Sequence, residues 1–160
     1  MPAVRKSRRS VTEQVRTELQ QIRTQVAGVR GSLVATSDGL VVAHDIPDVE
    51  PTQIAAPAAA TLAVARRATL ATQCGTFREA AARGSDGYLA VYAAGDSAIV
   101  AVIGTSSLNV GMLQYRAREI IERIANSSQI GALAAPVRPA NDDSAKTSRS
   151  LPRRRPAASS

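Results

Sequence analysis

The chain offers few residues that could carry out covalent chemistry. His44 is the only histidine, and Asp45 follows it at the end of an apolar segment. A histidine beside an acid suggests the base of a serine nucleophile, with Ser32, Ser37 or Ser97 as the attacking group. That mechanism needs three side chains in one geometry, and these serines read as ordinary strand or turn residues. We therefore expect an exposed histidine at a strand end and no catalytic residue.

The single cysteine and the acids near glycines suggest no other reactive site. Cys74 is the only cysteine, so a disulfide framework is excluded and a zinc site of Cys and His ligands nearly so. No base is near it in the sequence, and we expect a buried or half-buried, inert thiol. Asp38, Asp86 and Asp96 each stand beside a glycine in a predicted turn, where Asp serves the backbone. We expect no metal and no cofactor.

The segment "GTSSLNVG", residues 104–111, follows a predicted strand and precedes a predicted helix. That position suits anion binding. However, the segment lacks the Lys-Ser/Thr of a P-loop and the glycine spacing of a dinucleotide fingerprint. We interpret it as a connecting loop with Asn109 as the helix cap, and an enzyme is the least favoured class. A ligand-sensing module would need a pocket, which close packing of small alanines disfavours.

Positive charge is concentrated at the two ends of the chain. The 160 residues have a net charge of +7, yet residues 11–129 hold ten arginines against eleven acids. A nucleic-acid reader usually has a basic face on its folded module. We expect a basic, disordered tail over residues 1–10, one domain over 11–127, and a second basic, disordered tail over 128–160, rich in Pro, Ser and Arg.

The tails leave a second interpretation open, in which they bind nucleic acid or anionic membrane through phosphate attraction. They contain no aromatic residue for stacking on single strands. The chain has no apolar run near the roughly 20 residues that span a bilayer. Its N-terminus lacks the apolar segment of a signal peptide. We predict a cytoplasmic protein whose membrane association, if any, comes through partners.

Apolar periodicity and turn residues predict eight elements. Helices are expected over residues 11–27, 52–73 and 108–125, from apolar residues at helical spacing. Strands are expected over residues 32–37, 40–45, 76–83, 88–94 and 97–103. Asp38-Gly39 predicts a type I′ turn between the first two strands. The order α-β-β-α-β-β-β-α places the chain in the α+β class.

The helix over 52–73 is unusually rich in alanine, and no charge occurs between Glu50 and Arg66. A helix that is apolar nearly all round is buried on more than one side. In so small a domain, one side faces its own sheet and the other is expected to face another chain. The strand over 97–103 is apolar on both faces and is predicted to be central, whereas the charged strand over 76–83 is predicted to be an edge or an interface.

Four segments together resemble the bacterial roadblock/dynein light chain family. They are "LVATSDGLVVA", the alanine-rich helix ending in "ARR", "DGYLAVYAAGD" and "NVGMLQYRAREIIERI". The resemblance covers about residues 12–125, and its scarcity of Lys beside abundant Arg and Ala suits an actinobacterial member. Such members are encoded near a sensor histidine kinase and a Ras-like small GTPase. The resemblance therefore implies a Ras-like GTPase as partner, within a complex that includes the sensor kinase.

The resemblance also implies a fold and an interface. Family members have a three-layer, profilin-like sandwich: a five-stranded antiparallel sheet with the first and last helices on one face and the middle helix on the other. They are non-enzymatic platforms that form homodimers through the middle helix and the third strand, and some stimulate GTP hydrolysis by their partner. The dimer interface predicted for this chain comprises Ile54, Ala58, Leu62, Ala65, Thr69, Phe77, Glu79 and Ala81.

Overall fold

A computed structural model of the chain describes residues 2–127, with side chains from residue 9 onward. The elements in chain order are α1 (Pro2–Gln25), β1 (Val29–Thr36), β2 (Val41–Asp45), α2 (Thr52–Ala71), β3 (Glu79–Arg83), β4 (Gly87–Ala94), β5 (Ala98–Thr105) and α3 (Val110–Asn126). The predicted order of elements is confirmed. The predicted tail over 128–160 lies outside the described residues.

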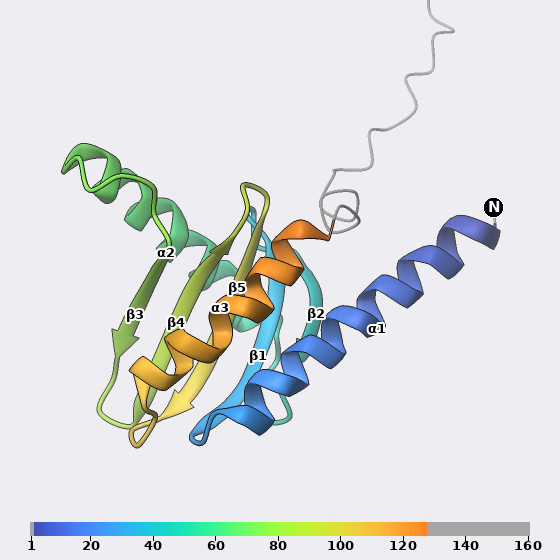
Figure 1. The fold of residues 1–160 in the computed structure, drawn as a ribbon, viewed down its shortest axis with the longest axis horizontal. Coiled ribbons are helices and arrows are strands. Elements are labelled where there is room, and N and C mark those ends of the chain that lie inside the picture. The colour runs from blue at the N-terminus through green and yellow to red at the C-terminus, as the bar shows by residue number, and fades with distance from the viewer. Residues whose placement is uncertain (1, 128–160) are drawn as a thin grey trace, which may run out of the picture.

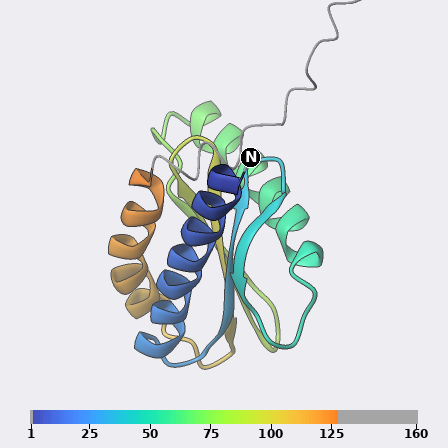
Figure 2. The same ribbon diagram turned by 90° about the vertical axis from the view of Figure 1, so that its right-hand side faces the viewer.

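The strands form one sheet in the order β2-β1-β5-β4-β3, and every neighbouring pair is antiparallel (Figure 1). Viewed along the plane of the sheet, α1 and α3 lie on one face and α2 lies alone on the other (Figure 2). This is the three-layer α+β sandwich that was expected. β5 pairs with β1 and β4, so the strand that is apolar on both faces is central, as predicted.

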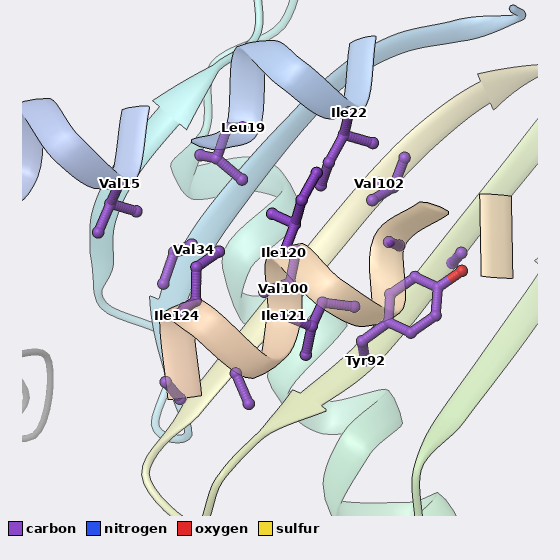
Figure 3. Close-up of a cluster of buried hydrophobic side chains, with 14 of the residues drawn as sticks. Val15, Leu19, Ile22, Val34, Tyr92, Val100, Val102, Ile120, Ile121 and Ile124 are labelled. Carbon is purple, nitrogen blue, oxygen red and sulfur yellow. The ribbon is translucent and has the colours of Figure 1, made fainter. Parts of the chain in front are cut away.

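The larger of two cores lies beneath α1 and α3. Leu19 and Ile22 of α1 meet Ile120 and Ile124 of α3 above the strands, and none of the four side chains is more than 2% exposed (Figure 3). Their spacing of three or four residues puts them on one face of each helix. Since an apolar stripe of this kind must be buried against another element, the two helices are fixed side by side on the sheet.

The second core lies between α2 and the opposite face of the sheet. Leu62 of α2 packs there with Leu33 of β1 and Ile99 of β5, and all three are at most 2% exposed. Ile99 points into this core, whereas its neighbour Val100 points into the other, as the alternation of side chains along a strand requires.

The N-terminus differs from the sequence prediction. Helix α1 begins at Pro2, so residues 2–10 continue the helix and do not form a separate disordered tail. Proline is well tolerated in the first turn of a helix, because its missing N–H would have no helical partner there. Val11 is the first buried residue of the part whose side chains are described.

The turn between β1 and β2 is not the predicted type I′ turn. Gly39 has a positive φ of 90°, but Gln73 is the only non-glycine residue with a positive φ among those described, so Asp38 is not left-handed. The Gly39 N–H donates to the Thr36 carbonyl, and the Thr36 N–H donates to the Leu40 carbonyl. These bonds define a three-residue loop that ends in a left-handed glycine, the next commonest hairpin connection.

Candidate interaction surface

The structure separates the residues considered for a serine-type site. His44 lies opposite Leu33 and so points toward α2, whereas Asp45 lies opposite Ser32 on the other face of the sheet. The Asp45 carboxylate contacts Arg23, with Nε 2.8 Å from Oδ2, and the buried Ser32 hydroxyl donates to the Leu19 carbonyl. His44 is half-buried, not exposed as predicted, because it projects on the sheet face that α2 covers. The three groups share no site.

Two further candidates for chemistry have structural roles. Cys74 is exposed, so the prediction of a buried or half-buried thiol is wrong: α2 ends at Ala71, and residues 72–76 that follow it are all exposed. Asn109 caps α3 as predicted, since its side-chain oxygen accepts from the Met112 N–H at 3.0 Å. Within residues 2–127, no three acidic, His or Cys side chains are grouped to hold a metal ion, and no helix is long and apolar enough to cross a membrane.

The two sides of α2 have different environments. Its inner side is set by Ala55, Ala58, Ala59 and Leu62, which are buried against the sheet. Of the predicted interface, Ala58, Leu62 and Phe77 are enclosed in the second core, so their side chains are not available on the surface of the single chain. Leu62 is the bulkiest buried residue of α2, and it packs against the sheet of its own domain.

Other residues of α2 remain outside. The hairpin turn packs against one flank, where a Cβ added at Gly39 would lie 3.3 Å from the Ala56 Cα. The side of the helix that is turned away from the sheet carries Pro57, Thr61, Val64 and Ala68, which we call the outer flank. Val64 is 68% exposed, which is unusual for a large apolar residue next to a run of alanines. The outer flank has no charged residue.

Strand β3 is one edge of the sheet, and its backbone groups alternate in direction. The Ala93 N–H donates to the Arg78 carbonyl, and the Gly84 N–H donates to the Gly87 carbonyl. The backbone groups of Arg78 and Gly84, and of the even-numbered residues between them, therefore point toward β4. By alternation, the N–H and C=O groups of Glu79, Ala81 and Arg83 point away from the sheet. An edge of this kind is a template for pairing with another strand.

The side chains of these outward residues share the α3 face of the sheet. Glu79 lies opposite Tyr92, which belongs to the core beneath α1 and α3. Burial raises the pKa of the Tyr92 phenol well above its ordinary value, and the nearby Glu79 carboxylate raises it further. Arg83 lies opposite Tyr88, and its guanidinium is 5.6 Å from the centre of that ring. Glu79, Ala81 and Arg83 are all exposed.

An open groove of about 910 Å³ adjoins the start of β3. It lies between the end of α2, the loop leading to β3, the β4–β5 turn and one side of α3. Arg66 lines the groove and donates to the Gly95 carbonyl at 2.9 Å and the Asp96 carbonyl at 3.4 Å. The lining carries Arg66, Arg78 and Arg118 against Glu79, Asp96 and Glu122, so the groove has no field of one sign for a polyanion.

Of the eight predicted interface residues, Glu79 and Ala81 are exposed on the β3 edge, and Ile54, Ala65 and Thr69 are half-buried. Sequence reasoning missed Val64, because a helix made almost wholly of alanine gives no contrast from which to read its orientation. It also missed Arg83 as a counterpart of Glu79. The four-residue spacing of these opposite charges in one strand was a signal that could have been used.

Comparison with known proteins places the fold. The family model for the Roadblock/LC7 domain matches residues 16–104. The chain is similar in fold to a Roadblock/LC7 domain from Streptomyces avermitilis, at 19% identity and a TM-score of 0.64, covering 68% of this chain and 92% of that one. No curated protein sequence matches the chain significantly.

Two further structures agree. The gliding protein mglB from Thermus thermophilus is 19% identical, with a TM-score of 0.65 over 72% of this chain and 88% of that one. A structure described as MglB with a tetrameric arrangement is 21% identical, with a TM-score of 0.66 over 78% of this chain and 93% of that one. At these identities the likeness establishes the fold alone. The family match spans more than half of the chain, which therefore belongs to the Roadblock/LC7 domain family.

Proposed function

We propose that this protein is a non-enzymatic, cytoplasmic homodimer that binds a Ras-like small GTPase and regulates its nucleotide cycle. The observation that carries the proposal is the combination of an open sheet edge at β3 with the uncharged outer flank of α2, a helix that contacts β3. In a small domain, such a pair of features is expected to be covered by another chain. Membership of the Roadblock/LC7 family supports a second copy as that chain.

The geometry of the dimer follows from the two features. Antiparallel pairing of β3 with its copy would join the two sheets into one, with both α2 helices on the same face. The outer flanks, with Val64 at their centre, would then approach each other across the two-fold axis. Alanine and Thr on these flanks allow close contact between the helix backbones. The combined face of the two α2 helices is the surface we assign to the GTPase.

Nucleotide-dependent capture tests the GTPase partner. The tagged full-length chain would be incubated with lysate of the source cell in GDP or in a non-hydrolysable GTP analogue. We expect a Ras-like GTPase to be enriched in one nucleotide state and, once purified, to change its hydrolysis rate when the chain is added. Capture of no GTPase in either state would contradict the proposal. Binding without a change in hydrolysis would restrict the role to that of a scaffold.

A second function, binding of anionic membrane or nucleic acid, is favoured by the basic start of α1. Residues 5–9 contain Arg5, Lys6, Arg8 and Arg9 on helical backbone, without an acid among residues 1–10. Phosphate attraction of this kind weakens steeply as salt rises. Co-sedimentation of the chain with phosphatidylserine vesicles, or its retention by duplex DNA, should fall when residues 1–10 are removed. Unchanged binding by the shortened chain would exclude the role of this segment.

A further inference from the structure

The edge of β3 carries opposite charges at its two ends, on one face and with outward-pointing backbone groups. Glu79 is the first residue of the strand and Arg83 the last. Both are exposed, and both project on the α3 face. Neither forms an ion pair with any residue of the described part of the chain, although two ion pairs occur elsewhere in it. Arg83 is instead held over the Tyr88 ring.

Symmetry restricts how this strand can pair with its own copy. In a continuous sheet related by a two-fold axis, residues opposite each other must project on the same face. Successive residues of a strand project on opposite faces, so only residues separated by an even number of positions can be opposite each other, and some residue must face its own copy. A register slip therefore moves the pairing by whole two-residue steps.

One of these registers uses the edge fully. With Ala81 opposite its own copy, the outward N–H and C=O groups of Glu79, Ala81 and Arg83 all find partners in the second strand. The same register places Glu79 of each copy opposite Arg83 of the other. Hydrogen-bonded residues that are opposite in antiparallel strands have Cα atoms about 5.5 Å apart, within reach of a carboxylate and a guanidinium. Ala80 and Ala82 of each strand project on the α2 face, which is therefore free of bulky side chains at the junction.

We propose that Glu79 and Arg83 form reciprocal ion pairs across a β3–β3 interface and thereby set the register and the partner choice of the homodimer. The inference rests on the homodimer of the proposed function and adds the identity of the residues that specify it. The same charges have another use on an edge strand, which is to prevent pairing with other chains. In the reciprocal arrangement, however, the edge attracts a second strand only if that strand carries the complementary charges at the opposite positions.

Charge exchange tests the pairing. In full-length Glu79→Arg, each copy presents two arginines, and in Arg83→Glu each presents two glutamates. Like charges directly opposite each other destabilise a strand pair, so each variant alone should dimerise about tenfold more weakly or worse, by sedimentation equilibrium. An equimolar mixture of the two should give heterodimer well above the statistical half, by native mass spectrometry. The double variant E79R/R83E should recover the wild-type dissociation constant.

A matched pair of controls separates this effect from overall charge. Glu13→Arg and Arg16→Glu make the same charge changes at exposed positions on α1, away from the edge. Their mixture should remain statistical, and each should dimerise like the wild type. If the wild-type chain is a monomer at all concentrations, the proposed homodimer itself fails. If it is a dimer that the edge variants leave unchanged and unselective, the dimer stands and the ion pairs are refuted.

Discussion

Tyr92 is a residue whose surroundings control its protonation. It is 4% exposed in the core beneath α1 and α3, and Glu79 lies opposite it on β3. Burial disfavours the charged phenolate, and the glutamate carboxylate disfavours it further, so the folded protein holds the phenol proton more tightly than the unfolded chain does. Because the two states differ in proton binding, stability must depend on pH at the alkaline end.

The sign of that dependence gives a prediction for Tyr92→Phe. Below about pH 10, the usual pKa of tyrosine, both states keep the proton and Tyr92 makes no pH-dependent contribution. Above it, the unfolded chain loses the proton first, so the free energy of unfolding of the wild type falls by up to about 1.4 kcal/mol per pH unit. Urea titrations between pH 9 and 11 should show a smaller fall in Tyr92→Phe. Equal slopes would mean that Tyr92 ionises freely in the fold.

The inner and outer sides of α2 should respond differently to truncation. Leu62 is 2% exposed and Val64 is 68% exposed, although they are two residues apart on one helix. Leu62→Ala should lower the free energy of unfolding by about 2–5 kcal/mol, because it leaves a cavity in the second core. Val64→Ala should change it by no more than about 0.5 kcal/mol in the monomer. Denaturant unfolding at low protein concentration measures both, and similar losses would reverse the assigned orientation of the helix.

Assembly should report on the outer flank independently. Val64→Arg adds a charge to an exposed position, so the monomer should fold with an unchanged circular dichroism spectrum. If the outer flanks meet in the homodimer, the two added charges would face each other, and the dimer should dissociate at micromolar concentration in light scattering. Ala125→Arg, at an exposed position in the last turn of α3, is the control and should remain dimeric. A Val64→Arg chain that stays dimeric would exclude contact through this flank.

The elements differ in how far their sequence determined them. The order of strands and helices could be predicted because periodicity and glycine-containing turns are local signals, as "SDG" and Gly95-Asp96 show. The orientation of α2 could not, since Ala55, Ala56, Ala59 and Ala60 are chemically identical yet only some are buried. The type of the hairpin turn depended on the sign of φ at Asp38, and an Asp-Gly pair does not by itself determine that sign. The orientation of α2 was therefore the least predictable feature.

At the scale of the whole molecule, the N-terminal helix joins a projecting segment to the core. Figure 1 shows α1 running diagonally past the sheet, with its first turns beyond the other elements. Val11 and Val15 are the first of its residues to be buried, and Glu18 makes an ion pair with Arg123 of α3 at 2.7 Å. Exposed ion pairs contribute little, about 0–1 kcal/mol, so the valines dominate the attachment.

Shortening the chain should locate the boundary of the folded unit. Removal of residues 1–10 takes away no buried side chain known from the described part, and the midpoint of urea unfolding should hardly change. Removal of residues 1–16 also takes away Val11 and Val15, each worth about 1.5–3 kcal/mol of burial, and should lower the free energy of unfolding accordingly. If the shorter deletion already cost several kcal/mol, the first turns of α1 would be part of the core.

The exposed cysteine gives the molecule a built-in reporter. Cys74 is the only thiol of the chain and lies on the surface between α2 and β3, close to the proposed interface. One spin label can therefore be attached to each copy without mutation. Two copies related by a two-fold axis would contain a single label-to-label separation, whereas a ring or a filament would give every label two neighbours. Electron–electron dipolar spectroscopy of the labelled protein would thus read the symmetry of the assembly directly in solution.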